Sequence, residues 1–129
     1  GSLYPYYVKN ASETPFCLAG IYTLTDDGYV TFSILTHPAA GVVKRVHNVD
    51  KTMPLILNED LHAAWLEEFR VPGELFEILN TPHQYRMEVC PIARECFNSN
   101  ISYESMLEPV FYNDLPVGVA EDSSERINP

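Results

Sequence analysis

Residues 31–36 show a period of two, with Thr31 and Ser33 on one side of the alternation and Phe32 and Ile34 on the other. These residue types favour extended structure. The pattern therefore predicts a β-strand whose two faces differ in polarity.

A second apolar run, residues 16–24, comes just before this strand, and Asp26–Gly28 between the two is typical of a tight hairpin turn. We therefore expect an antiparallel hairpin. Ala19 and Gly20 form a small-residue spot where another element can approach closely. Pro38 should end the returning strand, because proline has no backbone N–H to give to a ladder.

The next segment predicts a short helix, a strand and a further helix. Three valines within residues 39–46 form a one-sided apolar stripe, and Met53–Leu57 is an apolar run of strand length. Asn58 stands where a helix N-cap should be, and two acidic residues follow it in the first turn, where the helix dipole favours anions. The apolar positions from residue 61 to residue 69 keep helical spacing.

The flanking regions supply fewer elements. Residues 3–9 predict an aromatic edge strand, whose tyrosines either pack across strands, the favoured interpretation, or form a stacking platform for bases. Val71–Gly73 should break the chain before a short helix at 74–79. Residues 85–92 predict another strand, and the acidic tail 119–129 is expected to fray.

Length and composition predict a single folded domain. The chain has 129 residues, 46% of them hydrophobic, and no run reaches the roughly 18 apolar residues of a membrane span. Its net charge of −10 is unfavourable for non-specific nucleic-acid binding, although a local basic patch remains compatible with it. Cys17, Cys90 and Cys96 match no zinc spacing, and Cys17 is expected to be a buried, inert thiol in a cytoplasmic protein.

The stretch from residue 31 to residue 66 also carries an ordered set of landmarks. They are a Thr at a strand end, a Pro-Ala turn, a His, a Met-Pro pair, an apolar strand, an acidic helix start and an Ala-Trp-Leu sequence. In order, these are Thr36, Pro38-Ala39, His47, Met53-Pro54, Leu55-Ile56-Leu57, Glu59-Asp60 and Ala64-Trp65-Leu66.

This order resembles the SOS-response-associated peptidase (SRAP) family. The resemblance runs from about Tyr4 to Val110 and implies an α+β fold, in which a bent, mainly antiparallel sheet forms an open pseudo-barrel with few short helices. It covers the C-terminal part of the family's domain. Residues 1–129 are thus expected to be a single SRAP-like domain without its N-terminal portion.

The family resemblance implies a role in the DNA-damage (SOS) response. Such a protein binds single-stranded DNA and captures abasic sites covalently, as a DNA–protein crosslink through an N-terminal Cys that closes a thiazolidine. It also implies a peptidase (hydrolase) activity that exposes this Cys. The family's Met-Cys-Gly-Arg start and its Gly-Phe-Tyr-Glu-Trp motif have no counterpart here. The chain alone should therefore be inactive, and no cofactor or metal is expected.

The resemblance implies specific site residues. His47 matches the family's catalytic His, with a surface His as the alternative, and Thr36 matches its active-site Thr, with an ordinary strand Thr equally favoured. Thr52 stands where family members carry an Arg, which puts DNA contact at this point in doubt. The candidate DNA-binding cations are Lys44, Arg45, Lys51 and Arg94, the last with a surface salt bridge as an equal alternative.

Two hypotheses follow for the partners. In the first, they are single-stranded DNA with abasic sites and the missing N-terminal part of the chain's own domain, in the cytoplasm or at a bacterial nucleoid and without a membrane. In the second, the chain is a divergent, non-catalytic family member that acts as a protein-interaction module, which its net charge of −10 and Thr52 favour.

Overall fold

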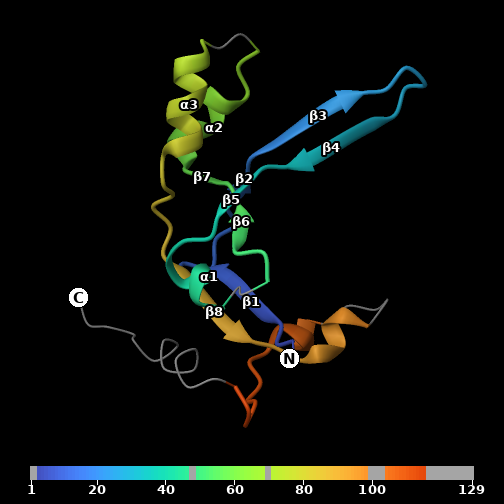
Figure 1. Cartoon of the computed structure of the whole chain (residues 1–129), viewed down its shortest axis with the longest axis vertical. Coiled ribbons are helices and arrows are strands. Elements are labelled where there is room, and N and C mark those ends of the chain that lie inside the picture. Colours follow the sequence, from blue (N-terminus) through green and yellow to red (C-terminus); the bar gives the residue numbers. More distant parts are fainter. Residues whose placement is uncertain (1–2, 47–48, 69–70, 99–103, 116–129) are drawn as a thin grey trace.

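A computed structural model describes residues 3–46, 49–68, 71–98 and 104–115. The described chain combines short antiparallel strands with short helices, and the sheets do not close into a barrel (Figure 1). The strands are β1 (Tyr6–Asn10), β2 (Cys17–Leu18), β3 (Gly20–Leu24), β4 (Val30–Ile34), β5 (Thr36–Pro38), β6 (Thr52–Pro54), β7 (Ile56–Leu57) and β8 (Met87–Pro91). The α-helices are α1 (Gly41–Val46), α2 (His62–Trp65) and α3 (Pro72–Asn80), and the 3₁₀ helices are η1 (Glu59–Leu61), η2 (Arg94–Phe97) and η3 (Glu104–Leu107).

The predicted hairpin is confirmed, and it forms the β3–β4 ribbon. Its strands are antiparallel, and Tyr22 lies opposite Phe32. Gly28 has a φ of 88°, a left-handed conformation that glycine adopts without steric cost, and its N–H donates to the carbonyl of Thr25 to close the turn. In Figure 1 the ribbon stands out from the rest of the chain.

Three extended segments, at residues 17–24, 30–38 and 52–57, each pair with one segment over their first part and with a different segment over their second part. Ala19, Leu35 and Leu55 form a closed ring of backbone hydrogen bonds, which we call the three-strand junction. Each residue donates its N–H to the next: Ala19 to Leu55 at 2.8 Å, Leu55 to Leu35 at 2.8 Å, and Leu35 to Ala19 at 2.9 Å. On either side of this ring, β2 pairs with β7, β3 with β4, and β5 with β6, all antiparallel.

The junction explains three departures from the sequence expectation. Residues 16–24, 31–36 and Met53–Leu57 were each expected to be one strand, and each is interrupted, at Ala19, Leu35 and Leu55 respectively. At each of these residues the backbone N–H donates to one of the other two segments and the carbonyl accepts from the remaining one, so the residue belongs to none of the two-stranded ladders. The Ala19 side chain is fully buried, as the small-residue spot predicted.

The core consists of two small clusters that share the apolar run at 55–57. Leu55 and Leu57 pack with Ile78 of α3, whereas Ile56 packs with Met87 of β8. A strand buried on both faces reads as a continuous apolar run, which accounts for the pattern in the sequence. The first cluster includes Ala19 and Leu55 of the junction and holds α3 to it, whereas the second holds β8 to Ile56.

Two helix starts differ from the sequence expectation. Asn58 precedes η1 but makes no capping bond, because its side chain donates to the carbonyl of Pro82 at 3.1 Å and accepts from the N–H of Gln84 at 2.7 Å. Pro72 does not break the chain but opens α3, where its missing N–H removes no helical hydrogen bond. The expected helix at 39–46 is confirmed as α1.

The burial predicted for Cys17 is wrong. Cys17 is exposed, because β2 pairs over only two residues, with β7, and lies outside both core clusters. Burial instead raises the pKa of the Cys90 thiol on β8, which makes it a poorer nucleophile. Phe69 and the tail 119–129 lie outside the described residues.

Candidate functional site

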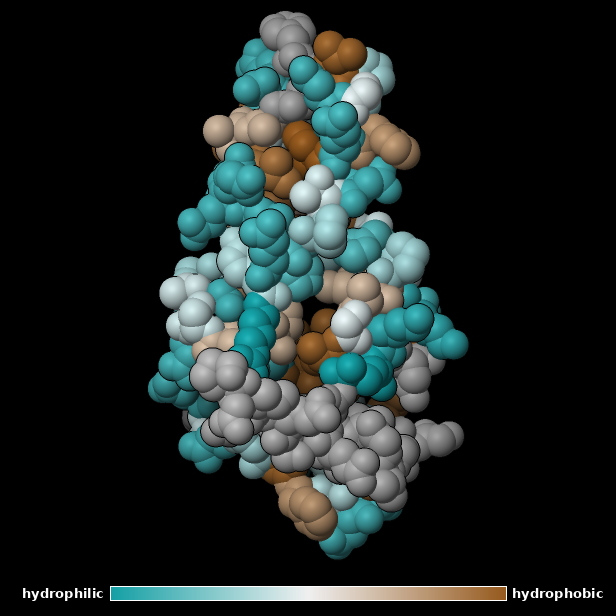
Figure 2. Space-filling model, turned by 90° about the vertical axis from the view of Figure 1, so that its left-hand side faces the viewer, coloured by the Kyte–Doolittle hydropathy of each residue, from teal (hydrophilic) through white to brown (hydrophobic). Residues whose placement is uncertain are grey.

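A cavity of about 1360 Å³ lies between the strand pair β1–β8, the segment β5–α1 and the connection from α3 to β8. We call it the central cavity. Apolar side chains of the junction region, Met53, Leu55 and Ile56, form part of its lining. Figure 2 shows a hollow at mid-height with hydrophobic surface inside it and hydrophilic residues around it. The volume exceeds the roughly 300–1,000 Å³ of a typical small-molecule pocket.

The charge of the central cavity is opposite to that of the whole chain. The chain carries 8 basic and 18 acidic residues. Among the described residues that line the cavity, however, Lys9, Arg45 and Arg86 are basic and Glu88 alone is acidic. A local basic surface of this kind attracts phosphate even where the overall charge does not.

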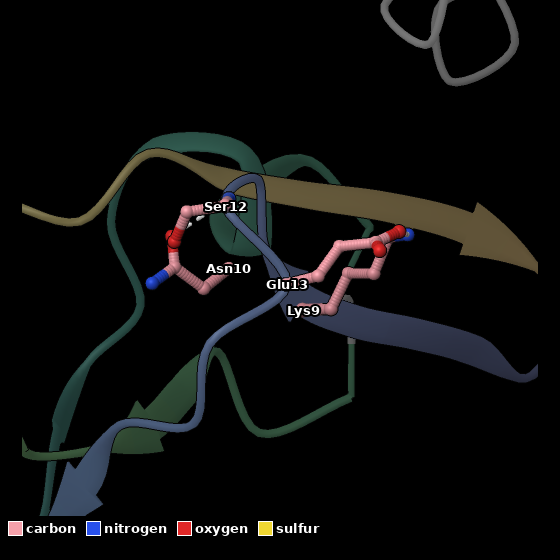
Figure 3. Close-up of polar contacts among 4 residues, drawn as sticks. All are labelled: Lys9, Asn10, Ser12 and Glu13. Carbon is pink, nitrogen blue, oxygen red and sulfur yellow. Dashed lines mark hydrogen bonds and ion pairs between the residues drawn. The ribbon is translucent and has the colours of Figure 1, made fainter.

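Lys9 is already engaged by a carboxylate. Its Nζ lies 2.9 Å from Oε1 of Glu13, and Figure 3 shows the two side chains extending together. The pair raises the pKa of Lys9 and lowers that of Glu13 through this hydrogen bond. Both groups are exposed, so the pair contributes little to stability and an anion in the cavity can compete for Lys9.

A tight turn positions Glu13 for this contact. The buried Asn10 accepts from the N–H of Ser12 at 3.4 Å and donates to the hydroxyl of Thr14 at 2.9 Å, as Figure 3 shows for the first of these bonds. Glu13 adopts a φ of 60°, and its N–H donates to the Asn10 carbonyl. Asn10 thus organises the turn that places Glu13 beside Lys9.

Two histidines line the central cavity. His37 of β5 and His83 of the α3–β8 connection both face the cavity, and the His83 ring stacks on Tyr85 with centroids 6.2 Å apart. Burial lowers the pKa of His83, and nearby His37 lowers it further. The buried Nδ1 of His83 has no hydrogen-bond partner. The lowered pKa of His83 favours its neutral form, although a backbone hydrogen bond with Tyr85 acts in the opposite direction.

Of the two predicted catalytic residues, the structure describes Thr36 but not His47. Thr36 is exposed on β5 opposite Pro54 and is not among the cavity residues; its neighbour His37 is. His47 follows α1 directly in the sequence but lies outside the described residues. A catalytic role for Thr36 and His47 stays a prediction.

The predicted cations on and after α1 fall into different surroundings. Arg45 lines the central cavity, whereas Lys44 is exposed outside it. Lys51 is exposed with a φ of 54°, and its carbonyl accepts from the N–H of Ala39 at 2.8 Å. Thr52, in the place of the family Arg, is the exposed first residue of β6.

Arg94 contacts the protein itself. Its Nε donates to the Leu3 carbonyl at 3.1 Å, and its guanidinium lies over two aromatic rings, 4.9 Å from that of Tyr4 and 5.1 Å from that of Tyr112. Tyr4 also packs edge-on against Tyr112 at 5.2 Å. This aromatic packing accounts for Tyr4 without a base-stacking role, and a DNA contact by Arg94 stays a prediction.

Sequence reasoning did not single out Arg86 or His83. Both stand in the stretch between α3 and β8, where no motif marks them. The sequence shows only their positions next to predicted elements: Arg86 lies near the start of a predicted strand, and His83 follows the predicted helix end at Thr81–Pro82. Only the pairing of β8 with β1 brings this stretch to the same cavity as Lys9.

Comparison with known proteins supplies the family. A search of curated proteins gives no match. Among solved structures, the chain resembles a structural-genomics protein of Bacteroides thetaiotaomicron with a TM-score of 0.72 and 25% sequence identity. The alignment covers 84% of this chain and 49% of that one, so the chain spans about half the length of this relative.

The described helices do not include one that is both long and apolar enough to cross a membrane. The sequence model of the SOS response associated peptidase (SRAP) family matches residues 1–99, most of the chain and all of the landmarks between Thr36 and Leu66. The α+β arrangement of short antiparallel strands agrees with the expected fold, and the chain belongs to the SRAP family.

Proposed function

We propose that this chain is part of an SRAP protein that binds single-stranded DNA and captures abasic sites covalently in the response to DNA damage. The observation that carries the proposal is the basic lining of the central cavity in an otherwise acidic chain. Family membership supports the same function. The nucleophile would come from a part of the protein outside these 129 residues.

The proposed reaction begins at the ring-opened sugar of the abasic site. The amine of an N-terminal Cys attacks the aldehyde carbon, and loss of one water gives an imine. The Cys thiol then adds across the C=N bond, sulfur to carbon and hydrogen to nitrogen, which closes a thiazolidine. An α-amine with a pKa near 8 is partly neutral at pH 7, so it serves as the nucleophile without strong activation.

This chain's residues would bind the DNA and move protons. Arg45 and Arg86 offer guanidinium groups for phosphate at the cavity. His47 would act as a general acid–base during ring opening and closure, and Thr36 would hydrogen-bond the sugar. The family's peptidase activity, which would expose the Cys, belongs to the same proposal.

The covalent step is tested with a protein that carries the native N-terminal Cys in front of this chain. We expect a denaturant-resistant adduct with single-stranded DNA that contains an abasic site. Replacing His47 with Ala should slow adduct formation by about 10²-fold or more, as expected for loss of a general acid–base. Absence of any adduct with the Cys in place would overturn the proposal.

The DNA-binding step is tested by salt dependence. Arg45→Ala and Arg86→Ala should each weaken binding to single-stranded DNA and reduce the slope of log K against log salt by about 0.7. Lys44→Ala on the same helix, outside the cavity, is the matched comparison and should change the slope less. Equal effects of Lys44→Ala and Arg45→Ala on the slope would contradict a role of the central cavity in DNA binding.

One observation favours the second function, a protein-interaction module without catalysis. Eighteen large apolar side chains are exposed among the described residues, against nine buried apolar ones. Thr52 in place of the family Arg points the same way. A protein of this second kind would show no affinity for single-stranded DNA at low salt, whereas the first function requires affinity that salt removes.

A further inference from the structure

Part of the central cavity has an aromatic wall. His83 and Tyr85 both line the cavity from the connection between α3 and β8, and their rings stack with centroids 6.2 Å apart and planes 29° apart. Phe16 is not part of the lining, but its ring packs against that of Tyr85 with centroids 6.1 Å apart. A flat ligand in the cavity can therefore pack against a ring that the protein already holds in place.

The cavity lining also contains buried polar atoms that lack hydrogen-bond partners. Among the described residues, such side-chain atoms occur at Tyr6, His83 and Tyr85, and all three residues line the central cavity. Buried polar atoms of this kind are rare in folded proteins, because they have lost their water and gained no bond in exchange. A ligand in the cavity can supply the missing bond.

His83 is the best placed of the three residues to meet a flat ligand. Tyr6 pairs with Pro91, at the opposite end of β8 from the aromatic wall. The pKa of the Tyr85 hydroxyl is raised by burial and then by Glu59, which does not line the cavity. The unpartnered Nδ1 atom of His83, in contrast, belongs to a ring that stacks on Tyr85 within the lining.

Apolar and cationic groups complete these surroundings. Met53, Leu55 and Ile56 supply apolar surface to the same lining, and Arg86, which follows Tyr85 in the sequence, supplies a guanidinium. A nucleotide has the matching parts: a flat base with a hydrogen-bonding edge, and a phosphate that a guanidinium can bind through two donors. Proteins that bind single strands commonly stack bases on aromatic side chains and hydrogen-bond their edges.

We propose that the His83–Tyr85 wall of the central cavity is a subsite for one intact nucleobase of the bound single strand. The face of the base packs against the Tyr85 ring, its polar edge hydrogen-bonds Nδ1 of His83, and Arg86 binds the adjoining phosphate. The inference rests on the proposed function, because it assigns a place to a base of the same strand. It adds that the protein contacts an ordinary nucleotide besides the abasic one.

The contribution of the base is measured with two strands of equal length and charge. One has a mixed sequence of all four bases, and the other carries a tetrahydrofuran abasic analogue at every position, which has no aldehyde to react. We expect the 129-residue chain to bind the base-bearing strand about fivefold or more tightly than the base-free strand, as stacking of a single base typically provides.

Substitutions separate the base from the phosphate. His83→Phe keeps a ring and removes Nδ1, so it should lower the affinity ratio of the two strands by about threefold or more and leave the affinity for the base-free strand unchanged. Arg86→Ala should weaken both strands by the same factor. His62→Phe on α2, outside the lining, is the matched control and should preserve the ratio.

A second measurement uses the unmodified chain and so does not depend on how a variant folds. Nuclear magnetic resonance of isotopically labelled histidine follows the Nδ1 resonance of His83. Adding the base-bearing strand should shift this resonance, because Nδ1 gains a hydrogen bond, whereas the base-free strand should leave it in place.

Three results decide against the subsite. Equal affinities for the two strands, with an unmoved Nδ1 resonance, would overturn the inference and leave the proposed function intact, since salt-dependent phosphate binding remains. If neither strand binds at low salt, the proposed function fails and the subsite fails with it. If deoxynucleoside monophosphates bind as tightly as the base-bearing strand, the site belongs to a free nucleotide and not to DNA.

Discussion

The three-strand junction and the β3–β4 ribbon are built from the same two strands, yet they differ in what surrounds them. At the junction, the backbone of Ala19 bonds to Leu35 and Leu55, and side chains from α2 and α3 pack around it. A few residues further along, Tyr22 and Phe32 pair only with each other, and their side chains are exposed. Hydrogen bonding alone therefore does not distinguish the two regions; packing does.

The comparison indicates which part of this chain is stabilised by its own packing. Backbone hydrogen bonds are satisfied in both regions, but their net contribution to stability is small, whereas burial of apolar surface supplies most of the driving force. We expect the junction to be the most stable part of the 129-residue chain, and the ribbon, whose apolar side chains are exposed, to be less stable.

The largest expected effect is the loss of a junction side chain. Leu55 is 5% exposed, and Leu55→Ala should lower the free energy of unfolding by about 2–5 kcal/mol, since it removes buried surface and leaves a cavity. Leu24→Ala on the ribbon, where the side chain is 67% exposed, should change it by about 0.5 kcal/mol or less. Urea unfolding of both variants measures the difference, and equal losses would contradict the contrast.

An intermediate effect is expected where the two regions are tied together. The indole Nε1 of Trp65 on α2 donates to the carbonyl of Gly20, the first residue of β3, at 3.3 Å. Trp65→Phe keeps an aromatic ring and removes this bond, which should cost about 1 kcal/mol in the free energy of unfolding. Far-UV circular dichroism follows the unfolding, because the chain's one Trp is lost.

Tyr22→Phe is the matched control for that bond. Its ring is 77% exposed on the ribbon, so removing the hydroxyl should leave stability nearly unchanged. A loss as large as that of Trp65→Phe would show that the ribbon is held as firmly as the junction.

A smaller effect, of opposite sign, is expected beside the junction. Lys51 adopts a φ of 54°, which costs a residue with a Cβ about 1 kcal/mol and costs glycine nothing. Lys51→Gly should therefore raise the free energy of unfolding by about 0.5 kcal/mol, after the greater freedom of glycine in the unfolded chain is counted. Lys44→Gly inside α1 should lower it by a similar amount, and a loss in both would contradict the strain at Lys51.

The weakest expected effect is a dependence of the free energy of unfolding on pH, which His83 in the lining of the central cavity should cause. The pKa of His83 in the folded chain is below its ordinary value of 6.5 because of burial, so the unfolded chain binds more protons as the pH falls. Its contribution to stability is complete above pH 6.5 and declines as the pH falls from there toward the folded pKa. His83→Gln should therefore lose less stability than the parent between pH 7.5 and pH 5.5 in urea unfolding. Identical pH profiles would contradict the burial of this imidazole.

Part of the candidate site could be predicted from the sequence. The helix at 39–46 and the hairpin turn were predictable because amphipathic stripes and Asp-Gly turns are local signals. Arg45 was predicted to bind DNA, and it lines the central cavity. Its contact with DNA stays a prediction. Arg86 and His83 were not predictable, because no local pattern says that their segment crosses to β1.

The misread positions share one cause. Asn58 has the identity of an N-cap, yet its amide serves the backbone of Pro82 and Gln84, whose positions depend on how α3 returns to the sheet. Cys17 lies in an apolar run, yet it is exposed, since its strand pairs over two residues only. In each case a distant segment decides what a local residue type can do.

By itself, the sequence determined the local features of this protein: the two-faced hairpin, the short helix after β5, and the ordered landmarks that mark an SRAP chain. Only the tertiary structure decided where strands exchange partners, how basic residues from β1, α1 and the segment before β8 gather at one cavity, and which apolar side chains of the hairpin stay exposed. The physical reason is the separation along the chain over which each interaction acts. Turn chemistry and periodicity act over a few neighbouring residues, whereas partner exchange and burial depend on segments far apart in the chain.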